Sequence, residues 1–266
     1  MPQQRASSEF IFQVFALVIA VIIVHAVYVT LIRPNANAII EQQLALQAAG
    51  ETVVAERSFY VVIKDYEQES CFILMLWVMS IIGYKAKRTL DERKLLNQSL
   101  LTVAEGSRIL PEDARQLARP IQSLPPRQQQ YLLPRALLAA LNRFSATRNI
   151  QDVSSAVTEV LDMESDRLDS ELSMVRYISW AIPSIGFIGT VRGIGEALVQ
   201  APEAVQGNIV GVTASLGVAF NSTFIALVIS IIVMFFMHQL QLLQERLVLD
   251  THSYCDTGLL RFLKSE

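Results

Sequence analysis

Two threonines stand among small residues in two long hydrophobic stretches of the C-terminal half. Thr190 lies between Pro183 and Gly195, a stretch with four glycines, and Thr223 follows Ser222 in the second stretch. A hydroxyl group can both donate and accept a hydrogen bond. It can therefore replace water around a passing ion without carrying a charge. These residue types indicate an ion pathway through Thr190, Thr223 and Ser222.

The small residues recur at the spacing of a helix face. Positions three and four apart lie on the same side of a helix, so each stretch carries one stripe of small side chains. The stripes are Gly186, Gly189, Thr190 and Gly193 in the first stretch, and Ser215, Ala219, Ser222, Ala226 and Ser230 in the second. Taken alone, they favour close helix packing, which needs no transport role. Two hydroxyl-bearing stripes on adjacent helices favour a pore face as well.

Arg192 is a charged residue inside the first stretch. Glu196 lies four positions later, so the two side chains can form an ion pair on one helix or between two copies. The alternative is that Arg192 extends alone to the membrane interface. We expect the pair to lie near the outer mouth of the pathway.

The elements that must position these residues are membrane helices. A helix needs about 20 mainly apolar residues to cross a bilayer. The four candidate transmembrane segments are 10–32, 71–84, 177–199 and 209–237. The second is short, and a buried or interfacial helix is its alternative interpretation. The sequence predicts an all-α, polytopic membrane protein with a helical cytoplasmic domain.

The distribution of Lys and Arg predicts the orientation. Basic residues cluster directly after the second segment, at Lys85, Lys87, Arg88, Arg93 and Lys94. Such clusters mark the cytoplasmic side. The predicted cytoplasmic parts are 1–9, 85–176 and 238–266, the last a C-terminal helix. The predicted outer parts are the helical segment 33–70 and the turn 200–208.

The long cytoplasmic part divides by its prolines. Residues 105–135 contain five prolines and predict short helices or turns, whereas 136–176 predict longer helices. Asp152 is the expected N-cap of the last of these. The acidic run Asp162–Glu171 predicts a solvated helix face.

Composition excludes several classes of protein. Hydrophobic residues make up 52% and charged residues 18% of the chain, and the net charge of −3 argues against a nucleic-acid binder. Cys71 and Cys255 are too few for a disulfide framework and fit no metal motif, so buried thiols are expected. The three histidines lie far apart in the sequence. We expect no enzyme activity, no metal and no cofactor.

The stretch from Pro183 to Gly195 resembles the signature of the MotA/TolQ/ExbB proton channel family. The signature's fixed positions are Pro183, Gly186, Gly189, Thr190, Val191, Gly193 and Ile194. The run Gly217–Leu227 is similar to the family's second pore helix, and residues 1–70 fall outside the resemblance. By position, Thr190 and Thr223 match the family's two pore threonines.

The resemblance implies an ion-driven motor in the bacterial inner membrane. Five copies would surround two single-span partner helices of the ExbD/TolR/MotB type, each with a membrane aspartate. Ion flow would protonate and release that aspartate and move the two parts against each other. In a sodium-driven member the aspartate would bind and release Na+ instead, and the sequence does not decide between the two ions. Membrane lipid is the only other partner expected.

Two positions depart from the family pattern. Val218 stands where ExbB and TolQ members carry a glutamate, and Arg192 replaces a residue that is usually apolar. Either change could alter the ion path, the partner or the load. A scaffolding membrane protein and a small-solute transporter are the alternatives. A transporter usually shows more spans and internal repeats, which this sequence lacks.

Overall fold

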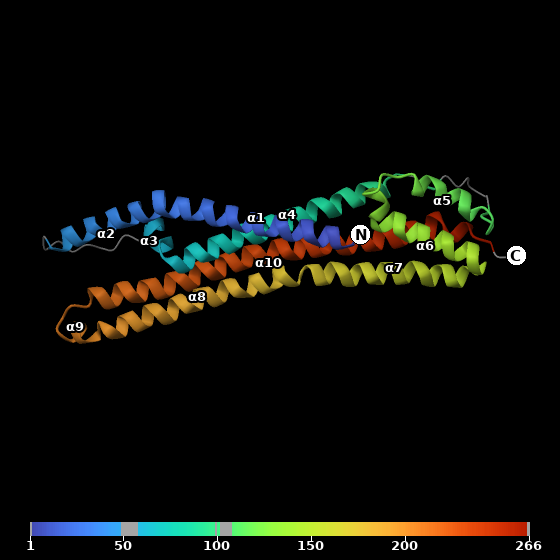
Figure 1. The fold of residues 1–266 in the computed structure, drawn as a ribbon. Coiled ribbons are helices and arrows are strands. Elements are labelled where there is room, and N and C mark those ends of the chain that lie inside the picture. Colours follow the sequence, from blue (N-terminus) through green and yellow to red (C-terminus); the bar gives the residue numbers. More distant parts are fainter. Residues whose placement is uncertain (1, 49–57, 99, 102–107, 265–266) are drawn as a thin grey trace. The chain divides into compact units, whose positions relative to one another are not determined.

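Helices make up most of the part of the chain that the structure describes. The computed structural model describes residues 2–48, 58–98, 100–101 and 108–264. Within these ranges it contains helices and one isolated bridge, between Ile109 and Leu263, but no strand (Figure 1). The predicted all-α fold is confirmed.

The helices form two compact units. The first unit contains Met1–Ile82 and Met174–Met237, and the second contains Gly83–Ser173 and His238–Glu266. Helices α4 (Tyr66–Leu96) and α10 (Val210–Gly258) contribute residues to both units.

In the first unit, the N-terminal part is one uninterrupted helical run. It consists of α1 (Pro2–Val27), the π-helical turn η1 (Tyr28–Ile32) and α2 (Arg33–Ala48). The run contains the predicted segment 10–32 and the start of the predicted outer helix. The short helix α3 (Phe59–Ile63) follows, and residues 49–57 lie outside the described residues.

Four helical segments among the described residues are long and apolar enough to cross a membrane. They are Glu9–Gln43, Tyr66–Leu96, Ile150–Val199 and Val210–Phe262. Helix α4 extends the apolar run 71–84 at both ends, so that run belongs to a helix of 31 residues. Lys, Arg and Glu are good helix formers and are frequent at both ends of α4, so the apolar run underestimates the length of this helix.

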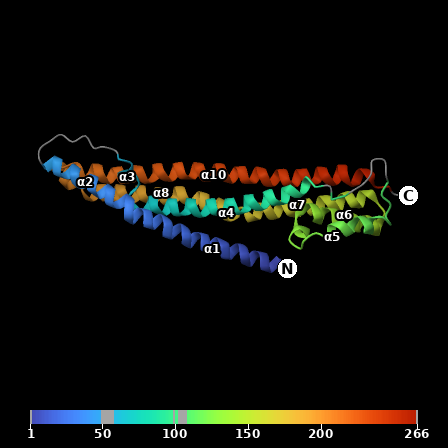
Figure 2. The same ribbon diagram turned by 90° about the horizontal axis from the view of Figure 1, so that it is seen from above.

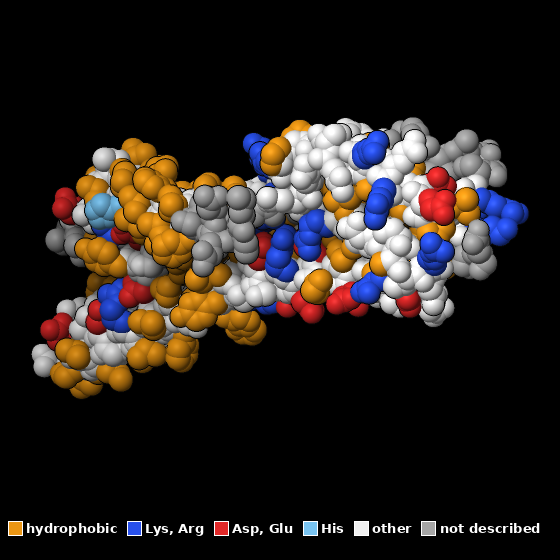
Figure 3. Space-filling view, turned by 45° about the vertical axis from the view of Figure 1, so that its right-hand side comes forward, with side chains coloured by type: hydrophobic (Ala, Val, Ile, Leu, Met, Phe, Trp, Pro, Cys, Tyr) orange, Lys and Arg blue, Asp and Glu red, His pale blue; other side chains and the backbone are white. Residues whose placement is uncertain are grey.

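The C-terminal part of the first unit is a helical hairpin. Helix α8 (Ser173–Val199) and the first part of α10 lie side by side, joined by the short helix α9 (Ala201–Val205) (Figures 1 and 2). Large apolar side chains such as Phe187, Phe224 and Ile231 are exposed on this hairpin. Figure 3 shows hydrophobic side chains over a large share of the visible surface. Such a surface suits lipid or other helices.

The second unit packs short and long helices around its own apolar core. Its remaining elements are α5 (Ala114–Gln122), η2 (Gln128–Gln130), α6 (Leu132–Thr147), α7 (Ile150–Glu171) and η3 (Leu260–Phe262). The core joins α6 to the end of α10 through residues such as Leu137, Phe144 and Cys255, all fully buried. Helix α10 thus continues without a break through most of the predicted C-terminal helix.

The N-cap of α7 is Asn149, and the expectation of Asp152 is wrong. Arg148 adopts a left-handed conformation at φ 55°, and the extended Asn149 follows it. The Asn149 Oδ1 accepts a hydrogen bond of 2.9 Å from the backbone N–H of Gln151. Asp152 therefore lies in the first turn, where the helix dipole favours a negative charge.

The acidic run of α7 is only partly a solvated face. Glu164 is buried, and its carboxylate accepts from Arg135 at 2.8 Å and from Arg167 at 2.6 Å. Glu171 pairs with the buried Lys85 at 2.9 Å. Burial opposes the charged form of Glu171, but Lys85 and Arg167 outweigh it and lower its pKa.

Candidate functional site

The hydroxyl groups of Thr190 and Thr223 meet between α8 and α10. The two Oγ1 atoms are hydrogen-bonded to each other. The Thr223 hydroxyl also lies 3.0 Å from the carbonyl oxygen of Gly186, and the Thr190 hydroxyl lies 3.1 Å from that of Ala219. Both threonines are half-buried. The structure thus brings together two site residues 33 positions apart in the chain.

The hydroxyl protons of this pair are fewer than its contacts. Two hydroxyls carry two protons, yet they contact each other and the carbonyl oxygens of Gly186 and Ala219. When both protons point to carbonyls, neither hydroxyl donates to the other. When one hydroxyl donates to the other, one carbonyl contact loses its proton. The pair therefore has several proton arrangements of similar geometry, as a site that passes protons or ligates an ion requires.

The glycine stripe of α8 packs against the small residues of α10 in the same chain. A Cβ atom on Gly189 would lie 2.5 Å from the Cβ of Ser222, and one on Gly193 would lie 2.7 Å from the backbone nitrogen of Ala219. At Gly186 the added atom would collide with Ala226. Real Cβ atoms do not approach so closely, so the contact depends on glycine.

The two serines of the α10 stripe have different surroundings. Ser215 accepts a hydrogen bond of 3.3 Å from the Gln200 side chain. Ser222 is 1% exposed, and its hydroxyl has no hydrogen-bond partner among the described residues. A buried hydroxyl without a partner costs free energy. The Ser222 hydroxyl is therefore an unsatisfied polar group beside the threonine pair.

Arg192 forms two ion pairs, and the sequence suggested only one of them. Its Nη1 lies 3.0 Å from Glu196 Oε1 on the same helix. Its Nε and Nη2 lie 2.7 and 2.9 Å from the two carboxylate oxygens of Glu67, on α4. A bidentate pair is the stronger contact. Spacing within one segment could not reveal Glu67, because 125 positions separate it from Arg192.

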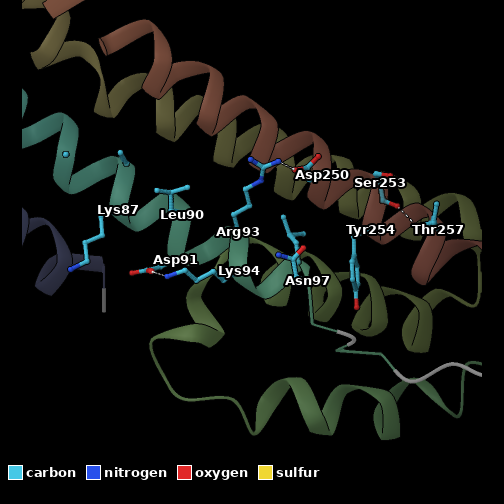
Figure 4. A pocket seen from close by; sticks show the side chains of 13 residues that line it. Lys87, Leu90, Asp91, Arg93, Lys94, Asn97, Asp250, Ser253, Tyr254 and Thr257 are labelled. Carbon is cyan, nitrogen blue, oxygen red and sulfur yellow. Dashed lines mark hydrogen bonds and ion pairs between the residues drawn. The ribbon is translucent and has the colours of Figure 1, made fainter. Parts of the chain in front are cut away.

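A pocket lies elsewhere, in the second unit. It has a volume of about 1020 Å³ and is lined by α4 and the end of α10 (Figure 4). Two of its cations are paired, Lys94 with Asp91 at 2.8 Å and Arg93 with Asp250 at 2.9 Å. These pairs compensate most of its charge.

The described parts of the chain contain both cysteines and the side-chain types that bind metals. They contain no group of three His, Cys, Asp or Glu side chains that could hold a metal ion. Cys71 and Cys255 are free and buried, as expected. Burial raises the pKa of Cys255 to about 12, which suppresses its reactive thiolate form.

Comparison with known protein families matches the part of the chain that holds the threonine pair. Residues 128–252 match the model of the MotA/TolQ/ExbB proton channel family. This segment, just under half of the chain, is similar to that family. No curated protein and no solved structure matches the chain.

The family match supports a proton channel-type role in energy transduction in a membrane. The matched segment runs from η2 through most of α10, and it contains the glycine stripe, the threonine pair and Arg192. Residues 1–127, including Glu67, precede it. The bidentate ion pair thus connects the family segment to the part of the chain outside the match.

Proposed function

We propose that the protein is the channel-forming subunit of a motor driven by the ion-motive force. The observation that carries this proposal is the hydroxyl pair of Thr190 and Thr223, held between two apolar helices of the family segment. Ions, most simply protons, pass this pair together with Ser222.

The partner is a single-span membrane protein of the ExbD/TolR/MotB type with an aspartate in its helix. Protons reach that aspartate by way of the threonine hydroxyls, which can exchange the donor role without a charge of their own. Protonation and release of the aspartate then move the partner relative to the channel. Five copies of this chain form the channel around two partner helices.

The motor stands in the bacterial inner membrane with both termini in the cytoplasm. The basic residues after the second apolar run support a cytoplasmic position for residues 85–176. The turn 200–208 and the segment 33–70 then lie on the periplasmic side. Arg192 and Glu196 stand on that side of Thr190, at the outer mouth.

The small-residue stripes do not favour a scaffold that only oligomerises. Gly186, Gly189 and Gly193 already pack against α10 of the same chain. They therefore need no second copy to explain their presence.

Purification of the complex from membranes of the native cells tests the proposal. Native mass spectrometry should give five copies with a co-purifying single-span protein. Proteoliposomes of the complex should take up protons when a membrane potential is applied. A stable monomer, or a complex without proton or sodium flux, would contradict the proposal.

A further inference from the structure

The first turn of α4 carries carboxylates that point to two different neighbours. Glu67 and Glu69 are two positions apart, and residues at this spacing do not share a helix face. Glu67 binds Arg192 of α8, as described above. Glu69 is hydrogen-bonded to Arg33 of α2 and lies 2.7 Å from Nδ1 of His25 in α1.

This turn is rigidly built. Asp65 stands at the N-cap position of α4, and its backbone N–H donates to the Gln68 side chain at 2.8 Å. The fully buried Gln68 in turn donates to the carbonyl of Val62 at 2.9 Å. A side chain at the third helical position that accepts from the N-cap N–H is half of a capping box and stabilises the helix start, and the helix dipole favours carboxylates in the first turn. The directions of Glu67 and Glu69 are therefore set by the backbone.

Both carboxylates are well shielded from solvent. The side chain of Glu67 is 11% exposed and that of Glu69 is 7% exposed. Ion pairs of exposed side chains contribute little, but a shielded carboxylate that loses its cation is strongly unfavourable. The two contacts therefore resist separation of α4 from its neighbours.

Glu67 reaches α8 at the functional position. A Cβ atom on Gly189 would lie 3.2 Å from Cγ of Glu67, as well as against Ser222. The Glu67 side chain thus crosses α8 beside the residue before Thr190 and ends at Arg192, two residues after it. The threonine segment of α8 is held by α10 and by Glu67 together.

We propose that the first turn of α4 is a two-sided carboxylate bracket that positions Thr190. Glu69 holds the N-terminal helical run on one side, and Glu67 holds Arg192 on the other. Glu67 and Arg192 are positioning residues, because they act on the ion pathway through the placement of α8. The bracket gives the helices outside the family segment a role in the channel. Only its effect on ion flux rests on the proposed function.

Hydrogen–deuterium exchange and proton flux of the purified complex test the bracket. Glu67→Gln keeps the shape and removes the charge. It should speed exchange of the backbone amides of residues 186–193 and lower flux about tenfold, the size expected from one lost charge-assisted contact. Glu196→Gln is the matched control, because Glu196 makes a single contact to Arg192 and its side chain is 45% exposed. It should change both readouts far less.

A double-mutant cycle makes the assignment specific. The double variant Glu67→Gln/Arg192→Gln should be no worse than either single variant, since each removes the same contact. Arg192→Lys keeps a charge and should recover part of the flux. Additive losses in the cycle, or equal effects of Glu67→Gln and Glu196→Gln, would overturn the positioning role.

The second side of the bracket is tested with Glu69→Gln. This variant should speed exchange in residues 186–193 although Glu69 does not contact α8 through any of its ion pairs. A change confined to residues 25–40 would overturn the two-sided bracket. If the variants show the expected exchange while the wild-type complex conducts no ions, that outcome supports the bracket and rejects the proposed function.

Discussion

Thr190 and Thr223 share a hydrogen bond between their hydroxyl oxygens across the α8–α10 hairpin. The contact makes two hydroxyls into one unit, because a proton given to one acceptor is withheld from another. Thr190 is also the one threonine of α8, and it follows Gly189 of the glycine stripe directly.

Removal of either hydroxyl should stop ion flux while the complex still assembles. Valine has nearly the shape of threonine, and loss of one hydrogen bond costs only about 0.5–1.5 kcal/mol of stability. We expect Thr190→Val and Thr223→Val to lower proton uptake in proteoliposomes to background. Thr213→Val is the control, since Thr213 is an exposed residue of α10 whose hydroxyl bonds to its own helix. Full uptake in the Thr190→Val/Thr223→Val double variant would exclude the pathway role.

The closeness of α8 to α10 predicts a strong difference between two glycines of one helix. An added Cβ would collide with Ser222 at Gly189 but would meet nothing within 4 Å at Gly195. Gly189→Ala should therefore destabilise the protein by about 1–3 kcal/mol, the usual cost of overpacking. Gly195→Ala should be neutral or stabilising, because alanine is the better helix former. Thermal unfolding in detergent measures both, and equal melting temperatures would contradict the close packing.

The sequence predicted what lies on one helix better than what lies between helices. The stripe from Gly186 to Gly193 follows from helical periodicity, and the matching stripe around Ser222 follows in the same way. To predict that the two stripes pack together, it was enough to assume that the adjacent helices form a hairpin. Glu67 was missed because no periodicity within α8 specifies which helix lies on its other side.

Local charge was a poor guide to burial. The acidic run of α7 reads as a solvated face, and Asp162 and Asp166 are indeed exposed. Glu164 is buried because Arg135, on the neighbouring helix α6, lies beside it. Likewise, the start of α7 depended on the backbone of Arg148 and Asn149, which side-chain type alone did not fix.

Glu164 should be one of the most sensitive positions of the second unit. Its carboxylate is 2% exposed and balances both Arg135 and Arg167. Loss of one partner from a buried ion pair typically costs about 3–5 kcal/mol. Glu164→Gln should lower the melting temperature strongly, whereas Glu159→Gln, at an exposed position of the same helix, should not. Similar melting temperatures would show that the Glu164 ion pairs contribute little to stability.

The stability of the second unit should also depend on pH through Glu92. Burial raises the pKa of Glu92 above its ordinary value of 4.5, and the nearby Arg88 and the Leu132 backbone N–H only partly oppose this. Between the two pKa values the folded protein binds more protons than the unfolded chain. The contribution of Glu92 to the free energy of unfolding therefore decreases as pH rises through that window.

Glu92→Gln removes this titration, because the amide stays neutral at every pH while it can still accept from Leu132 N–H. The melting temperature of the variant relative to wild type should therefore rise as pH increases from about 4 to 8, with most of the change just above the ordinary glutamate pKa. The exposed Glu112 is the control, and Glu112→Gln should give a difference that does not depend on pH. If the melting temperatures of Glu92→Gln and wild type change with pH in parallel, the fold does not disfavour the charged form of Glu92. A relative melting temperature that falls with pH would mean that the ion pair with Arg88 outweighs burial.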